Sequence, residues 1–150
     1  MSLYAPEVIT YKISEIESNS PSEDRYDTFS SANFSAWAVI DGHGGVEACD
    51  IVKNILIQYV YEKLIACDSI DDPESVSSII DASFQKCDDA VLQEALKKVK
   101  IEITDPVEIN GDITSKVSLS KVREAGRPGC CAIIVIIVGK YIYAANLGYV

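Results

Sequence analysis

The chain has 150 residues, of which 48% are hydrophobic and 24% are charged, a composition typical of a single globular domain with a core of useful size. Its formal net charge of −10 argues against nucleic acid and against an anionic membrane surface as partners, because both bind clustered lysine and arginine. A protein this acidic needs a bound cation or a local positive group if it handles phosphate.

The hydrophobic pattern predicts an α+β domain in which helices pack on an antiparallel sheet. Alternation of apolar and polar residues predicts strands, whereas apolar residues three and four positions apart predict amphipathic helices. In chain order the expected elements are a strand at 7–16, a proline-containing loop at 18–22, strands at 23–29 and 34–40, helices at 46–66 and 73–99, an irregular segment at 100–126, and two strands within 130–146 joined at Gly139 and Lys140.

The cysteines indicate reduced thiols in an intracellular protein. Their number is odd and no CxxC pair occurs, which argues against both a secreted disulfide framework and a zinc site; they are Cys49, Cys67, Cys87, Cys130 and Cys131. The N-terminal residues carry no basic region followed by an apolar one, so we expect no signal peptide and a cytoplasmic location. The apolar run at 130–138 is too short to span a membrane and predicts a buried strand.

The segment DGHGG at 41–45 contains the only histidine, His43. A two-residue turn at Ala32 and Asn33 between the two preceding strands would place Asp24 opposite Asp41. The same register would place Glu23 opposite Gly42.

Carboxylates directly opposed across a hairpin repel each other, and a bound divalent cation removes that conflict. Carboxylate and carbonyl oxygens suit Mg²⁺ and Mn²⁺, and glycine at position 42 lets a backbone carbonyl approach such an ion. Gly44 and Gly45 leave the first amides of the next helix open to an anion. The same residues also fit a plain turn, a flexible strand-to-helix connection and an exposed His43 without a role.

Three stretches resemble the metal-dependent protein phosphatase family (the PPM or 2C type). They are SNSPSEDRYDTF at 18–29, FSAWAVIDGHGG at 34–45 and GCCAIIVIIVGKYIYAANLG at 129–148, and the first is similar to the pyruvate dehydrogenase phosphatase branch. The resemblance implies a sandwich of two antiparallel β-sheets flanked by helices. It also implies a protein serine/threonine phosphatase that hydrolyses phosphoserine and phosphothreonine in a phosphoprotein substrate with a metal-bridged water.

The resemblance assigns a role to each residue of the constellation. Asp41 matches the aspartate that bridges two Mg²⁺ or Mn²⁺ ions, and the carbonyl of Gly42 matches a further ligand. Glu23 matches the acid that reaches the second metal, and Asp24 is a neighbouring acid that supports the site. His43 matches the histidine that protonates the leaving alkoxide, a task suited to a side chain that exchanges protons near neutral pH.

The sequence departs from the family pattern at several positions. Asn19 stands where many members have a phosphate-binding arginine, and Arg25, the nearest substitute, lies on the other side of the two acids. Cys130 and Cys131 replace hydroxyl residues, which we interpret as a structural change of small buried side chains. Tyr149 stands where the family has an aspartate.

The remaining two metal-binding aspartates of the family would follow residue 150, so we expect residues 1–150 to be the N-terminal portion of one phosphatase-like domain. The alternative is a non-catalytic phosphatase-like module that binds a partner. The resemblance to the pyruvate dehydrogenase branch implies a mitochondrial location as the alternative to the cytoplasm. The oligomeric state is open.

Overall fold

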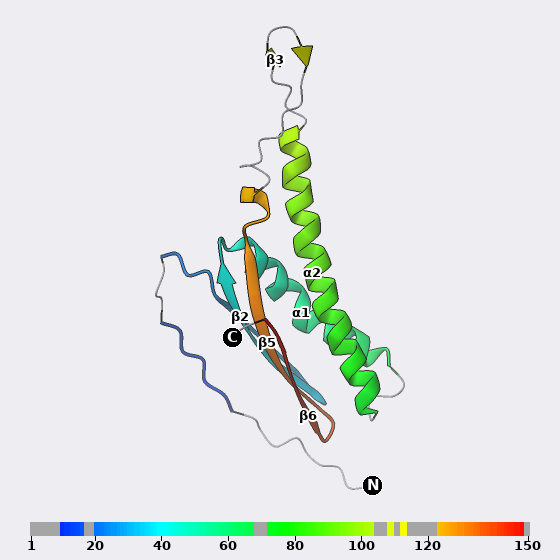
Figure 1. Ribbon diagram of the computed structural model, residues 1–150. Helices are drawn as coiled ribbons and strands as arrows, with labels where there is room; N and C mark the ends of the chain where they lie inside the picture. The colour runs from blue at the N-terminus through cyan, green and yellow to red at the C-terminus, as the bar shows by residue number, and fades with distance from the viewer. Residues whose placement is uncertain are drawn as a thin grey trace.

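A computed structural model describes residues 10–16, 20–67, 72–103, 108–109, 112–113 and 123–148, with side chains described outside 99–113. Strands β1, β2, β5 and β6 form one antiparallel sheet in that order, and β3 pairs with β4 separately (Figure 1). The elements are β1 Arg25–Ser31, β2 Phe34–His43, α1 Glu47–Ile65, α2 Pro73–Ile103, β3 Glu108–Ile109, β4 Asp112–Ile113, β5 Gly129–Val138 and β6 Tyr141–Leu147.

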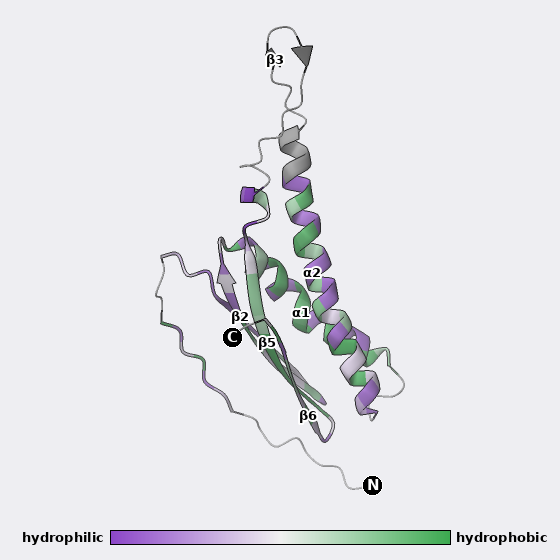
Figure 2. Cartoon of the chain, in the orientation of Figure 1, coloured by the Kyte–Doolittle hydropathy of each residue, from purple (hydrophilic) through white to green (hydrophobic). Residues whose placement is uncertain are grey.

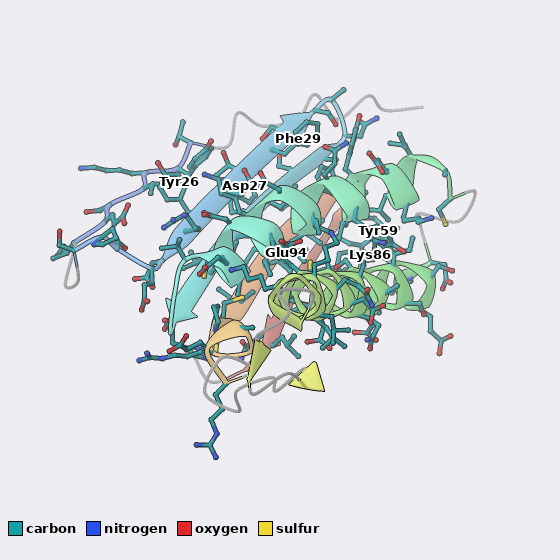
Figure 3. The ribbon with its side chains drawn as sticks, turned by 90° about the horizontal axis from the view of Figure 1, so that it is seen from above. Tyr26, Asp27, Phe29, Tyr59, Lys86 and Glu94 are labelled. Carbon is teal, nitrogen blue, oxygen red and sulfur yellow. The ribbon has the colours of Figure 1, made fainter. Side chains whose placement is uncertain are left out.

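The described residues form two layers. Helices α1 and α2 lie side by side on one face of the four-stranded sheet, and residues 10–16 run along the other face (Figures 1 and 3). Helix α1 packs on β1, β2 and β5, whereas α2 packs mainly on α1 and reaches β6. The predicted α+β class with helices on an antiparallel sheet is therefore confirmed, and the described residues contain a single four-stranded sheet.

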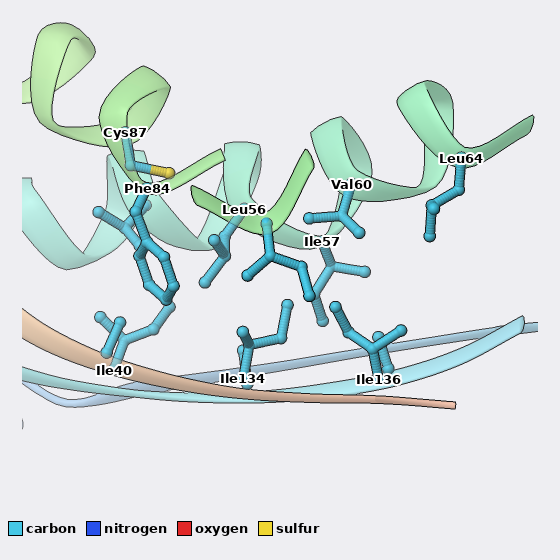
Figure 4. Close-up of a cluster of buried hydrophobic side chains, with 14 of the residues drawn as sticks. Ile40, Leu56, Ile57, Val60, Leu64, Phe84, Cys87, Ile134 and Ile136 are labelled. Carbon is cyan, nitrogen blue, oxygen red and sulfur yellow. The ribbon is translucent and has the colours of Figure 1, made fainter. Parts of the chain in front are cut away.

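The hydrophobic core lies between this sheet and the two helices. Along β2 the side chains alternate between buried and accessible, as a strand with one covered face requires. Ile40, Ile134 and Ile136 project from the sheet toward Leu56 and Val60 of α1, and none of the five has any measurable exposure (Figure 4). In Figure 2, coloured by hydropathy, α2 carries both hydrophobic (green) and hydrophilic (purple) residues, whereas most of β5 is green.

The predicted helices are both confirmed, and the second is longer than predicted. Helix α2 continues from Pro73 to Ile103, four residues past the predicted end. Asp72 begins it by accepting a hydrogen bond from the backbone N–H of Ser75 at 3.0 Å, an N-cap interaction that satisfies one of the open amides. Within the described residues, no helix is long and apolar enough to cross a membrane.

The strand predicted at 7–16 is wrong in the part that the structure describes. Residues 10–16 have no regular secondary structure, whereas residues 7–9 lie outside the described residues. The Tyr11 ring packs edge-on against Trp37 with 5.4 Å between centroids, and its hydroxyl donates a hydrogen bond to Thr28 Oγ1 at 3.2 Å. In this segment Tyr11 therefore contacts the sheet through its side chain and not through backbone pairing, whereas Ile16 is 90% exposed.

The two predicted hairpins are confirmed. The β1–β2 register pairs Arg25 with Ile40 and Ser31 with Phe34, which leaves Ala32 and Asn33 as the two-residue turn. In the second hairpin β5 ends at Val138 and β6 begins at Tyr141. The register of the first hairpin brings the acidic segment before β1 to the end of β2.

Candidate functional site

The acids before β1 lie beside the end of β2. The backbone N–H of Gly42 donates a hydrogen bond to Asp24 Oδ1 at 3.2 Å. Asp24 therefore lies beside the end of β2, as predicted, although the regular pairing of the two strands stops at Arg25 and Ile40. Asp24 and Asp41 are exposed, and Glu23 is half-buried. In the alternation of β2, Ile40 faces the helices and Asp41 faces the opposite side of the sheet.

Gly42 is the most closely enclosed residue of this group. A Cβ at this position would collide with the backbone carbonyl oxygen of Glu23 and would lie 2.6 Å from the Cys49 Sγ. Both contacts are far inside van der Waals distance, so only glycine lets Cys49 of α1 and the Glu23 peptide close on β2. The sequence predicted that glycine at position 42 lets a backbone carbonyl approach a cation. The packing against Cys49 was missed because this contact joins a helix to a strand.

Replacing Gly42 with alanine is expected to destabilise the chain by about 1–3 kcal/mol, the usual cost of forcing a methyl group into a filled space. Urea unfolding of the 150-residue chain measures the change. The stability lost through Gly42→Ala should be smaller in a Cys49→Ala background than in the wild type. In that background the sulfur is gone, and only the Glu23 carbonyl remains in the way of the added methyl group. Unchanged stability in Gly42→Ala would contradict the close packing described for this strand end.

His43 ends β2 with an exposed imidazole packed over Gly129 of the paired strand β5. A Cβ at Gly129 would lie 2.5 Å from His43 Nε2, so glycine at this position makes room for the ring. His43 also lines a cavity of about 250 Å³ that opens between α1, α2 and the start of β5. Val52, Phe84 and Cys130 are among its other lining residues. The role of Gly129 could not be predicted from the sequence, because it depends on the pairing of β5 with β2.

Three thiols lie near this cavity. A hydrogen bond with Cys130 and burial together raise the pKa of Cys49, and the same hydrogen bond lowers the pKa of Cys130. Burial raises the pKa of Cys87 to about 12. Cys130 and Cys131 are half-buried and not buried as predicted, because β5 faces the cavity on one side and the open side of the sheet on the other.

The connection to α1 uses two glycines with positive φ, 76° at Gly44 and 140° at Gly45, where a side chain would be strained. Val46 provides no side-chain cap, and the first turn carries Glu47 and Asp50. A hydrogen bond from Lys98 lowers the pKa of Glu47. The helix start predicted to bind an anion therefore already has two carboxylates near its positive end, which disfavours an external anion.

Arg25 points toward α1, where its Nε donates to Asp50 Oδ1 at 2.7 Å. It is therefore engaged away from Asp41, and the predicted substitute for a phosphate-binding arginine is not supported by this position. Asn19 and Tyr149, the two family departures noted above, lie outside the described residues.

The donor types at the strand end suit Mg²⁺ or Mn²⁺, since two carboxylates and glycine backbone are oxygen ligands of the preferred kind. The arrangement is incomplete, however. No group of three or more histidine, cysteine, aspartate or glutamate side chains within the described ranges is placed to hold a metal ion. The residues present thus fit part of a divalent-cation site, to which further ligands would have to be added.

No protein-family model matches the chain, and a search of curated proteins returned no match either.

Proposed function

We propose that this chain carries part of the active site of a Mg²⁺- or Mn²⁺-dependent protein serine/threonine phosphatase. The observation that supports this most is the meeting of Asp24 with the Asp41–Gly42 segment at one end of the β1–β2 hairpin, through the hydrogen bond from Gly42 N–H to Asp24 Oδ1. His43 follows directly on the same strand. In a chain of net charge −10, a bound cation would offset the repulsion between the carboxylates that meet there.

In the proposed site Asp41 and the Gly42 carbonyl would hold the metal, with Glu23 reaching a second ion and Asp24 supporting the group. Two bound Mg²⁺ or Mn²⁺ ions would supply a water nucleophile of lowered pKa for attack on phosphorus. The acidic residues at the strand end would hold the two ions, and His43 would give a proton to the serine or threonine oxygen that leaves. The substrate class is a phosphoprotein.

We also propose that the four-stranded sheet is one half of a two-sheet sandwich. Its face away from the helices bears apolar side chains with much surface accessible, including Val39 at 52% and Ile142 at 71%. Ile133, Val135 and Ile137 on β5 are half-buried on the same face. A second sheet packed about 10 Å away would bury this row, as in other sandwiches.

A non-catalytic phosphatase-like module is the second candidate. It is favoured by the lack of a complete ligand group within the described residues. Asp24 Oδ1 already accepts a hydrogen bond from Gly42, so this carboxylate has a structural use without metal. Such a module would retain the strand end as a rigid surface for a partner.

Metal titration and phosphatase assays distinguish the two candidates. We expect the 150-residue chain to bind Mn²⁺ weakly, with paramagnetic broadening centred on the amides of Asp24 and Gly42, and to show no turnover of an aryl phosphate by itself. The full-length gene product should hydrolyse the aryl phosphate in a Mn²⁺-dependent way that EDTA abolishes. A full-length product that neither binds Mn²⁺ nor hydrolyses phosphate would identify the non-catalytic module.

A further inference from the structure

Arg25 connects three parts of the chain that meet beside the candidate site. Its Nε donates to Asp50 Oδ1 at 2.7 Å, and its Nη1 donates to the backbone carbonyls of Ser22 at 2.9 Å and of Asp24 at 2.7 Å. The first contact reaches the first turn of α1, and the other two hold the segment that precedes β1. A single guanidinium therefore ties the acidic segment to a helix.

The two carbonyls lie on either side of Glu23. Arg25 thereby restrains the peptide group before Glu23 and the one after Asp24. The peptide group between these two residues is held by the Asp24 N–H, which donates to Ser22 Oγ at 3.3 Å. The Glu23 carbonyl is also pressed against Gly42. The restrained segment is thus the one that presents Glu23 and Asp24 to the end of β2.

Stability alone is a weak reason for this arrangement. The side chains of Arg25 and Asp50 are 24% and 50% exposed, and ion pairs with this much solvent contact contribute little to folding. An arginine guanidinium stays charged throughout the working pH range. A planar fork with several fixed donors is suited to joining separate acceptors, which a lysine ammonium does less well.

We propose that Arg25 is a positioning residue that holds Glu23 and Asp24 in place for divalent-cation binding, with Asp50 as its anchor on α1. The metal part of this statement rests on the proposed function. Partners that orient ligands without touching the metal commonly change metal affinity by about 10–100-fold when they are removed. Arg25 would act through Glu23 and Asp24 in this way and would not touch substrate.

The test compares Arg25→Gln, Arg25→Lys and Asp50→Ala with Lys63→Gln, which removes one positive charge from the opposite end of α1 and serves as the matched control. Amide hydrogen exchange in the metal-free 150-residue chain is the first measurement. In Arg25→Gln the amides of Asp24 and Gly42 should exchange at least about 10-fold faster, whereas those of Leu56 and Val60 in the middle of α1 keep their wild-type protection.

The variants should follow an order set by the contacts that they keep. Asp50→Ala removes the anchor but leaves both carbonyl acceptors, so its exchange rates should lie between those of wild type and Arg25→Gln. Arg25→Lys should recover only part of the protection. A uniform increase throughout α1, or no change at Asp24 and Gly42, would overturn the positioning role.

Mn²⁺ affinity is the second measurement, made by calorimetry on the 150-residue chain and through the activation constant of the full-length gene product. Arg25→Gln should weaken binding about 10–100-fold while kcat at saturating Mn²⁺ changes by less than about threefold, and Lys63→Gln should change neither. Unchanged affinity would overturn the role in cation binding. Absence of Mn²⁺ binding in the wild type would refute the metal part together with the proposed function, whereas the exchange result would still decide whether Arg25 positions the segment.

Discussion

The variant Asp41→Asn is expected to abolish Mn²⁺ binding by the 150-residue chain and phosphatase activity of the full-length gene product. Asp41 is the exposed carboxylate at the end of β2 beside Gly42, and in the proposed site it is the ligand shared by both ions. Removing its charge weakens the hold on two cations at once, whereas the amide that replaces it keeps the shape of the side chain. Calorimetric titration with Mn²⁺ and an aryl-phosphate assay measure the two losses.

The matched control is Asp81→Asn, which removes one negative charge from an exposed position on α2. This variant should bind Mn²⁺ and turn over substrate like the wild type. Thermal unfolding without metal should be nearly the same for Asp41→Asn and wild type, because an exposed carboxylate contributes little to stability. Wild-type turnover of Asp41→Asn at saturating Mn²⁺ would show that this carboxylate is not the shared ligand.

The parts of the fold that depend on local pattern could be predicted from the sequence. Apolar residues at helical spacing identified α1 and α2, and the polar turn at Ala32 and Asn33 set the register of the first hairpin. The segment at 7–16 has an equally regular alternation, but alternation alone does not say whether a segment pairs by its backbone or lies across a sheet by its side chains. Tyr11 on Trp37 shows the second outcome.

The part of the candidate site that could be predicted is the part that follows from the register of the first hairpin. That register is why Asp24 and Glu23 could be assigned to the same strand end as Gly42. Cys49 and Gly129 could not be predicted, because their roles come from contacts between elements that are distant in sequence: a helix sulfur against Gly42, and a glycine under the His43 ring. The sequence also did not show that the Arg25 side chain points toward α1, since a strand residue near the sheet edge can face either side of the sheet.

The contacts that the sequence did not reveal, Cys49 against Gly42 and Gly129 under His43, hold the end of β2 in place. The glycines at 42 and 129 allow α1 and β5 to close on the end of β2. Substrate-orienting and proton-donating groups are effective only when they are held in a defined geometry. The position of the His43 ring therefore depends on Gly129 as well as on β2. Variants at the two positions can separate proton donation by His43 from a structural role.

The variant His43→Gln is expected to reduce hydrolysis of a phosphoserine peptide by the full-length gene product by about 10²–10⁴-fold, the usual contribution of general acid catalysis. Hydrolysis of an activated aryl phosphate should fall far less, because its leaving group departs without help from a proton donor. Glutamine retains a polar side chain but cannot donate a proton to an alkoxide in this way. The kcat values for the two substrates at saturating Mn²⁺ give the comparison.

Two controls separate proton donation from placement of the ring. Gly129→Ala keeps His43 but puts a methyl group against Nε2, so it should displace the imidazole and mainly impair the peptide reaction. Mn²⁺ affinity should stay within about threefold of wild type in His43→Gln, since the imidazole is not among the proposed ligands. Equal losses on both substrates, or a large loss of Mn²⁺ affinity, would assign His43 to the structure of the strand end and not to proton transfer, because a general acid acts only on the step in which the leaving group departs.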